Sequence, residues 1–330
     1  MPNSAAEPSY VFANPRSGVR LRVVWPDNGS ARIRWSYLVP LAGVHILALL
    51  ACIPWLFSWI GLVVMVIGVH VFGQGINLGY HRLLTHRSFS APPWVERMLA
   101  LLGLCCMEDT PIKWISVHRR HHQHSDVRSD PHTPRAGFFW AHVGWLFVHN
   151  PDTHGYEAYR HYVPDLVQDR FYRWIEGGLR WIWIYVAHAV AFFVVGAALG
   201  VATTSSLLGG LQLGLSLFVW GVLVRTVAVW HITFSVNSLA HVAGYRNYST
   251  SDDSRNNWLV ALLTVGEGWH NNHHQDPSSA SNHHRWWEFD VSYYEIKLLE
   301  TLGLAWDVKS PHRRATPDVA RPVASRRRAA

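Results

Sequence analysis

The chain has 330 residues, of which 49% are hydrophobic, only 15% are charged and 18 are tryptophan. This composition excludes an ordinary soluble domain, in which about a quarter of the residues are charged. Three cysteines, two of them adjacent, provide neither a disulfide framework nor a C-x-x-C zinc motif. The net charge of +7 fits anionic lipid headgroups or an acidic partner protein, and we expect no nucleic acid partner.

Apolar runs dominate the chain after a polar N-terminal segment, residues 1–34, which we expect to lie in the cytoplasm. Each of four runs has about the length that a helix needs to cross a bilayer. These predicted spans are 37–53, 56–75, 181–201 and 207–224. The apolar stretch 92–107 is too short to cross, so it predicts an interfacial or re-entrant helix. The membrane domain is therefore expected to cover residues 35–305.

Arginine is distributed unevenly around the predicted spans. The turns at 52–58 and 200–206 contain no Lys or Arg, whereas the N-terminal segment, the long stretch 79–180 and everything after Arg225 are rich in arginine. The positive-inside rule therefore places both termini and the long stretch in the cytoplasm. The sequence predicts an all-α integral membrane protein with four transmembrane helices and a cytoplasmic helical cap. The tail 306–330, rich in Arg and Pro, is expected to be disordered.

Three histidine motifs occur in the parts predicted to be cytoplasmic. The motif H-x-x-H-H occurs at His118–His122 and again at His270–His274, and His81 and His86 form H-x-x-x-x-H. On a helix, residues three or four apart lie on one face, and neutral imidazole is the commonest metal ligand in proteins. Eight histidines exceed one four-coordinate site, which indicates two metal ions. The spacing does not decide whether the metal is iron, copper, zinc or nickel, because all of them accept nitrogen ligands.

The ordered set of motifs resembles the integral-membrane fatty acid desaturases, and within them the stearoyl-CoA (delta-9) desaturase-like group. The matching segments include Gly79–Phe89, His118–His132, Gly137–Trp145, Asn237–His241 and Gly266–His270. The resemblance covers about residues 35–305.

This resemblance implies a non-haem di-iron centre in the cap. The histidines that match the family's ligands are His81, His86, His118, His121, His122, His241, His270, His273 and His274. Asn237 matches a position that reaches one metal through a water molecule, and Trp114 matches a tryptophan that lines the bend of the acyl tunnel. Ligating histidines usually donate their other ring N–H to a carboxylate, and Asp126, Asp130 and Asp253 are our candidates for this role.

The implied reaction uses O₂, two iron ions and two external electrons to introduce a cis double bond, at the delta-9 position, into a saturated acyl chain. Removal of hydrogen from unactivated methylene groups needs an oxidant that iron and O₂ generate and zinc does not. The animal acyl-CoA enzymes carry a basic pair after a G-W-L motif, but the stretch from Gly144 to Pro151, which begins with Gly144-Trp145-Leu146, contains no Lys or Arg. The acyl chain could therefore be linked to CoA, a lipid or a carrier. We expect a separate electron donor, a ferredoxin or a cytochrome b5-like protein.

Two alternatives remain open at this point. A membrane hydroxylase of alkanes or lipids uses similar motifs and the same oxidant but leaves an alcohol on the carbon. A His-rich metal transporter is the more remote alternative, because transport needs polar ligands along a path within the spans. The predicted spans contain only the scattered His45, His70 and His188.

Overall fold

The structure is a computed structural model, and it describes residues 32–127, 129–150 and 154–311. Most of these residues are helical, and the described ranges contain a few isolated backbone bridges but no strand. Nearly all of the N-terminal segment and most of the tail 306–330 lie outside the described residues. The predicted disorder of that tail therefore stays a prediction.

Four helical stretches are long and apolar enough to cross a membrane, which confirms the predicted fold class. They are Trp35–Cys52, Trp59–Thr85, Arg180–Thr204 and Leu207–Val242. Their component helices are α1 (Trp35–Ala48), η2 (Leu49–Cys52), α2 (Trp59–Gln74), η4 (Gly75–Thr85), α9 (Arg180–Thr204), α10 (Leu207–Phe218), η7 (Val219–Val224) and α11 (Arg225–Val242). The second and fourth stretches continue well beyond residues 75 and 224, where the predicted spans end, and these extensions carry histidines of the motifs.

Two tight hairpins join these helices in pairs. At the first turn η3 (Pro54–Leu56) leads to Ser58, whose hydroxyl accepts a hydrogen bond from the Gly61 N–H at 2.9 Å and caps α2. Ser206 caps α10 in the same way. Helices α9 and α10 pack backbone to backbone, because a Cβ atom at Gly200 would lie 2.4 Å from the Gly209 carbonyl oxygen. Small residues permit this close approach between membrane helices.

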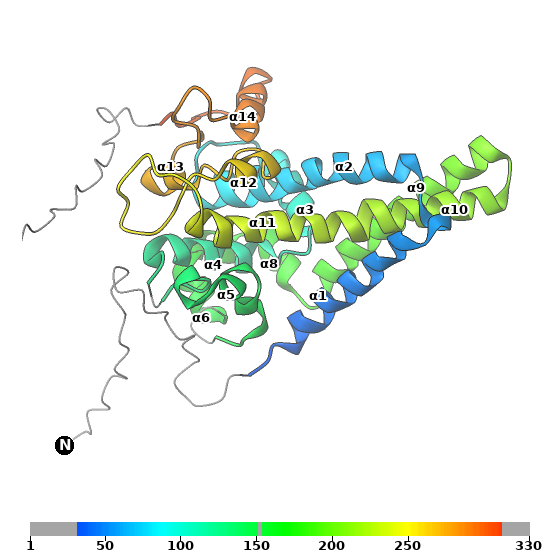
Figure 1. Cartoon of the computed structure of the whole chain (residues 1–330), viewed down its shortest axis with the longest axis horizontal. Helices are drawn as coiled ribbons and strands as arrows, with labels where there is room; N and C mark the ends of the chain where they lie inside the picture. Colours follow the sequence, from blue (N-terminus) through cyan, green and yellow to red (C-terminus); the bar gives the residue numbers. More distant parts are fainter. Residues whose placement is uncertain (1–31, 128, 151–153, 312–330) are drawn as a thin grey trace, which may run out of the picture.

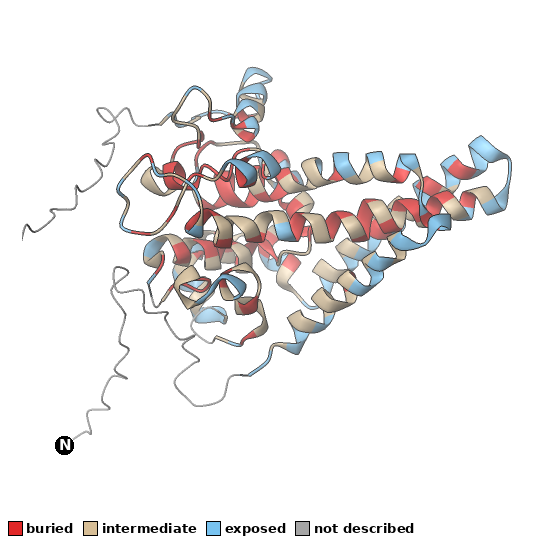
Figure 2. Cartoon of the chain, in the orientation of Figure 1, coloured by how far each residue is buried: buried red, intermediate tan, exposed pale blue. Residues whose placement is uncertain are grey.

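The remaining helices gather at the end of the molecule opposite the hairpin turns and form a cap (Figure 1). The cap contains α3 (Pro93–Leu104), α4 (Pro111–His124), η5 (Pro134–Ala136), α5 (Phe138–His142), η6 (Gly144–Phe147), α6 (Tyr156–Tyr162), α7 (Pro164–Gln168), α8 (Arg170–Glu176), α12 (Trp258–Leu263), α13 (His270–Gln275) and α14 (Val291–Thr301). Buried residues concentrate in the cap and in the helix ends that enter it, as Figure 2 shows. With 12 residues, α3 is too short to cross a bilayer.

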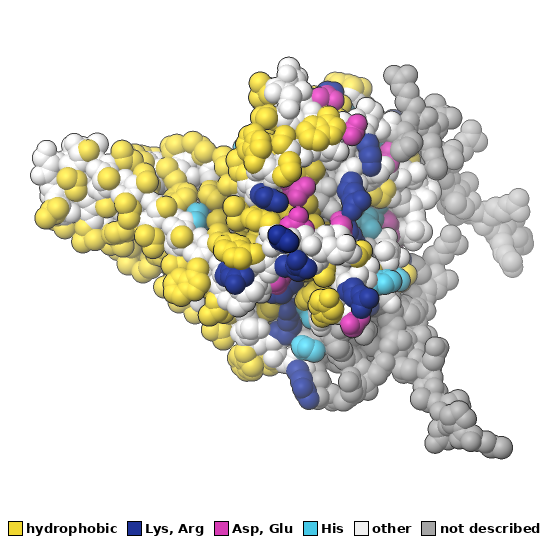
Figure 3. All heavy atoms as spheres, turned by 180° about the vertical axis from the view of Figure 1, so that it is seen from behind, with side chains coloured by type: hydrophobic (Ala, Val, Ile, Leu, Met, Phe, Trp, Pro, Cys, Tyr) yellow, Lys and Arg dark blue, Asp and Glu magenta, His cyan; other side chains and the backbone are white. Residues whose placement is uncertain are grey.

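The side chains at the surface also differ between the cap and the rest of the molecule. Hydrophobic side chains cover the narrow half of the molecule, and Lys and Arg side chains lie on the cap and at its border with that half (Figure 3). All three histidine motifs lie at the cap end. The cytoplasmic placement of this end rests on the arginine pattern and stays a prediction.

The segment η4 is a π-helix that continues α2 into the cap and buries most of its side chains. It packs directly on α3, since a Cβ atom at Gly75 would lie 2.1 Å from the Gly103 nitrogen. The wider turn of a π-helix changes the direction of the side chains relative to α2, and such segments are frequent at functional sites. This segment carries His81 and ends just before His86.

Candidate metal centre

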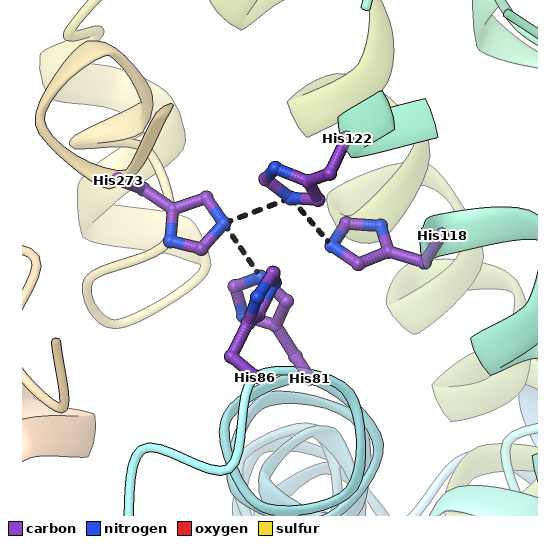
Figure 4. Close-up of side chains that lie close together, drawn as sticks. All are labelled: His81, His86, His118, His122 and His273. Carbon is purple, nitrogen blue, oxygen red and sulfur yellow. Dashed lines mark hydrogen bonds between the residues drawn. The ribbon is translucent and has the colours of Figure 1, made fainter. Parts of the chain in front are cut away.

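The nine histidines predicted as ligands come together in the cap as two adjacent groups. The five-histidine group contains His81, His86, His118, His122 and His273 (Figure 4), and the four-histidine group contains His121, His241, His270 and His274. One ring nitrogen from each member of a group lies within 4.8 Å of those of the other members. These side chains come from η4, α4, α11 and α13 and the segment after η4.

Each H-x-x-H-H motif serves both groups. On α4, His118 and His122 are one turn apart and enter the five-histidine group, whereas His121 points to the other group. On α13 the division is reversed, because His273 enters the five-histidine group while His270 and His274 enter the four-histidine group. The same two helices therefore fix the separation of the two groups, which explains why the motif occurs twice.

Two of the predicted carboxylates contact the histidines. Asp126 Oδ2 lies 3.0 Å from Nδ1 of His241, and Asp130 Oδ2 lies 3.0 Å from Nδ1 of His121. A carboxylate in this position accepts the Nδ1–H, which leaves the lone pair of Nε2 directed into the group. Burial alone would raise the pKa of Asp130, but His121 and His132 lower it, so this carboxyl is ionised at neutral pH.

The third predicted carboxylate, Asp253, makes a different contact. It pairs with Arg135 at 2.8 Å, and the neighbouring Asp252 lies 2.7 Å from Nδ1 of His274. The prediction that Asp253 supports a ligating histidine is therefore wrong, and the adjacent Asp252 makes this contact instead. The loop conformation directs Asp252 inward, where its other oxygen accepts hydrogen bonds from the Ser254 N–H and hydroxyl.

A fourth carboxylate, Glu267, was not assigned by the sequence analysis. Its Oε2 lies 2.9 Å from Nδ1 of His81. The fully buried Arg82 donates to Glu267 at 2.9 Å and to both oxygens of Asp290. Burial would raise the pKa of Glu267, but the charge of Arg82 lowers it to about 2. The sequence signal for this carboxylate was the Glu267-x-x-His270 spacing within the matching segment Gly266–His270.

The ring nitrogens that face into the groups are close enough to share a metal ion. Nε2 of His270 lies 3.0 Å from Nε2 of His241, and the corresponding distance between His118 and His122 is 3.1 Å. Two imidazole nitrogens, each about 2.1 Å from one ion and at right angles, are about 3.0 Å apart. Nine imidazoles without a thiolate are a donor set that fits iron.

Burial keeps these rings in the form that can bind a metal. Desolvation lowers the pKa of several histidines well below the ordinary value, and the neighbouring rings lower it further, so these imidazoles are neutral at neutral pH. They are His86, His118, His122, His270 and His273. Neutral imidazole offers the lone pair that a metal ion requires.

A cavity of about 400 Å³ leads to the groups, and His81, His118, His270 and Asn237 lie in its wall. Trp114 also lines it and stacks on His118, with 4.9 Å between ring centroids. Asn237 belongs to neither histidine group but reaches the same space one turn before His241. Apolar side chains of α1, α2 and α11 form much of the remaining wall, which suits a hydrocarbon chain.

Glu108 adds an acidic group to this apolar wall. One carboxyl oxygen accepts a hydrogen bond from Nε1 of Trp114 at 3.3 Å, and the other, Oε1, is buried. Burial raises the pKa of Glu108 to about 8, although hydrogen bonds from Thr233 and Trp114 oppose the shift. The carboxyl is therefore protonated and uncharged at neutral pH. Glu108 was not among the site residues predicted from the sequence.

Comparisons with known proteins agree with this site. A family model described as fatty acid desaturase matches residues 53–298. The chain is 40% identical over 295 residues to an sn-2 palmitoyl-lipid 9-desaturase of Nostoc sp. (strain 36), covering 88% of this chain and 96% of the relative. It is 40% identical over 280 residues to an sn-1 stearoyl-lipid 9-desaturase of Anabaena variabilis, covering 84% and 94%. It is also 38% identical over 276 residues to acyl-CoA 5-desaturase AL21 of Anemone leveillei, covering 83% and 79%.

The family model covers well over half of the chain, and these relatives align with most of it. The four membrane-spanning helices and the two histidine groups fit the same assignment. The chain belongs to the fatty acid desaturase family and is an integral membrane oxidoreductase that desaturates fatty acyl chains.

Proposed function

We propose that this desaturase binds one iron ion in each histidine group and introduces a cis double bond, at the delta-9 position, into an acyl chain that is esterified to a membrane lipid. The observation that carries the proposal is the pair of adjacent all-imidazole groups at the wall of an apolar cavity. The nine histidines are the proposed ligands, and Asn237 is proposed to reach one ion through water.

The two ions would supply the oxidising power, with O₂ and two electrons, that abstraction of hydrogen from a methylene group requires. The protein residues contribute position. Asp126, Asp130, Asp252 and Glu267 hold the Nδ1 atoms of four histidines and thereby orient the rings. The stack of Trp114 on His118 places an aromatic wall beside the groups, against which one segment of the acyl chain can be held.

Charges in the polar part of the cavity support a lipid rather than CoA as the carrier. Lys113 lies 3.4 Å from Glu176 and 3.8 Å from Asp109, and Arg34 donates to the imidazole of His154 at 2.8 Å. CoA phosphates are usually bound by Arg and Lys side chains that are available to them, whereas Lys113 and Arg34 already have partners in the protein. The relatives that are named acyl-lipid desaturases point the same way, whereas the acyl-CoA relative makes the direct test necessary.

The test combines metal analysis with lipid analysis. The purified protein should contain two iron ions per chain, and cells that express it should accumulate delta-9 unsaturated chains in membrane lipids. Headgroup, chain position and double-bond position are resolved by mass spectrometry. An alcohol at the target carbon would show a hydroxylase instead, and unsaturation that first appears in acyl-CoA would refute the lipid carrier.

Electrons are proposed to come from a separate ferredoxin or cytochrome b5-like protein. The net charge of +7 would favour encounter with an acidic donor, and salt screens such attraction over about 8–10 Å. Single-turnover reduction should therefore slow as ionic strength rises. A rate that does not depend on salt would refute electrostatic steering of the donor.

A further inference from the structure

The cavity reaches the outer surface between α2 and the end of the cap helix α12. Val66, His70 and Leu263 line the cavity, and yet Val66 and Leu263 are exposed and the side chain of His70 is only half-buried. Val66 is 58% exposed and belongs to the same outward face of α2 as Val63 and Ile67. This part of the wall is therefore an opening to the surface of a membrane-spanning helix, and we call it the lateral window, bounded by Val66, His70 and Leu263.

A polar bridge to α14 begins at His70, one of the residues that bound the lateral window. Nε2 of His70 lies 2.7 Å from Oε1 of Glu295, which connects α2 to α14. Ionisable groups on a membrane-spanning helix are costly and usually functional. At the cytoplasmic-side edge of the window, Asn77 donates a hydrogen bond to the Thr264 carbonyl at 2.9 Å. Helix α14 is thus connected to α2 by the His70–Glu295 bridge and by a hydrogen bond from the Ser292 hydroxyl to Oε1 of Gln74 at 3.1 Å, and the end of α12 is connected to η4 through Asn77.

The outer faces of the flanking helices suit lipid. Helix α12 exposes Trp258, Leu259 and Leu262, and α14 exposes a stripe that includes Tyr294 and Leu298. Short helices with such faces lie in the interface between headgroups and acyl chains. The lateral window therefore faces the acyl-chain region of the leaflet rather than water.

The route of entry determines whether the hydrocarbon chain has to pass through polar surroundings. A lipid chain that entered end-on through the polar part of the cavity would leave the bilayer and pass Arg34, Lys113 and Asp109. Each methylene group moved from an apolar environment into a polar, hydrated one costs free energy. Sideways movement through the lateral window keeps the chain in apolar surroundings along the whole path.

We propose that an acyl chain still esterified to a membrane lipid enters the cavity sideways from the bilayer through the lateral window, and that the His70–Glu295 bridge controls the opening. This inference rests on the proposed acyl-lipid function. It assigns a gating role to His70 and Glu295, while the headgroup stays outside at the membrane surface.

The first experiment blocks the window after the protein has folded. In a Cys52→Ser background, which removes the exposed native thiol, His70→Cys is purified and labelled with a bulky maleimide. Val63→Cys is the matched control, since it lies on the same helix and is 54% exposed but does not line the cavity. Substrates are dioleoylphosphatidylcholine vesicles that contain saturated monogalactosyldiacylglycerol or phosphatidylglycerol with myristoyl, palmitoyl or stearoyl chains.

Labelled His70→Cys should desaturate all three chain lengths more slowly than its unlabelled form, by roughly tenfold or more, with unchanged double-bond position. Labelled Val63→Cys should match its unlabelled form.

Equal rates for labelled and unlabelled His70→Cys would overturn the proposal. A loss confined to stearoyl chains would also overturn it, because residue 70 would then contact the end of the chain rather than its path. If the wild type desaturates none of these lipids, the proposed function itself is wrong.

The second experiment tests the bridge without relying on turnover. A Cβ atom at Gly73 meets nothing within 4 Å, so Gly73→Cys places a thiol inside the cavity next to the window without a clash. Glu295→Ala should increase the rate at which a lipid-soluble maleimide labels this thiol several-fold, while the labelling rate of Val63→Cys stays unchanged. An unchanged labelling rate at position 73 would show that the bridge does not control access.

Discussion

Individual carboxylates around the histidine groups act through single contacts to Nδ1 atoms. Asp252 makes such a contact to His274, whereas Asp253 pairs with Arg135 at the partly exposed edge of the cap. Adjacent residues of the same type therefore differ in what they stabilise. The difference can be measured with identical substitutions.

Asp252→Asn should weaken iron binding about 10–100-fold, because the imidazole of His274 loses an anionic acceptor. Asp253→Asn is the matched control and should change iron binding little, since it removes only a partly exposed ion pair. Iron retained by the purified variants during chelator titration measures both. Equal losses in the two variants would contradict the assignment of Asp252.

Glu108 should make the turnover rate of the enzyme depend on pH. Its pKa of about 8 means that the carboxyl is neutral below that pH and becomes charged above it, within the apolar wall and beside Trp114. Turnover of the wild type should therefore fall as pH rises through about 8. Glu108→Gln keeps a neutral hydrogen-bonding group and should remove this fall while it retains activity at pH 7. A wild-type profile that Glu108→Gln leaves unaltered would refute this role.

Whole elements position the groups, and the contact between η4 and α3 is among the closest of these. Gly75 lies against the backbone of α3, so that any side chain there displaces the segment that carries His81. Helix α4 and helix α13 then supply histidines at spacings of three and four to both groups. The separation of the two groups depends on these elements rather than on any one ligand.

Gly75→Ala should destabilise the protein by about 1–3 kcal/mol through overpacking against α3. Gly43→Ala on α1 is the control, because a Cβ atom there meets nothing within 4 Å. The higher helix propensity of alanine should leave that variant as stable as the wild type or slightly more stable. Thermal unfolding in detergent compares them, and an equal melting temperature for both variants would show that η4 adapts without cost.

At the scale of the whole molecule, the four long helices bring every histidine motif to one end. The hairpin turns at the other end contain no Lys or Arg, whereas basic side chains occur on the cap and at its border (Figure 3). This uneven distribution of basic side chains between the two ends is what the predicted orientation requires.

Tags at both termini should be cytoplasmic, and so should residues 115–125. Accessibility labelling of single cysteines in oriented vesicles measures this, with a cysteine at position 205, in the second hairpin turn, as the control on the opposite side. If position 120 were reached from the outside while position 85 was reached from the inside, the four-span arrangement would be wrong.

The sequence by itself predicted the four spans and eight of the nine histidines in the two groups. Apolar length determines whether a helix can cross a bilayer, and the positions of His118, His121 and His122 on one helix follow from local geometry. His241 came from the family resemblance alone, because a single histidine on an apolar helix carries no local signal.

Tertiary structure decided how the histidines divide between two groups and which carboxylates support them. Asp126 meets His241 across 115 residues of sequence, and Arg82 meets Glu267 across 185. Contacts at such separations depend on how helices pack and on loop conformation, which local periodicity does not encode. For the same reason only the packed structure distinguishes Asp252 from Asp253, and only the position of α14 beside α2 brings Glu295 to His70.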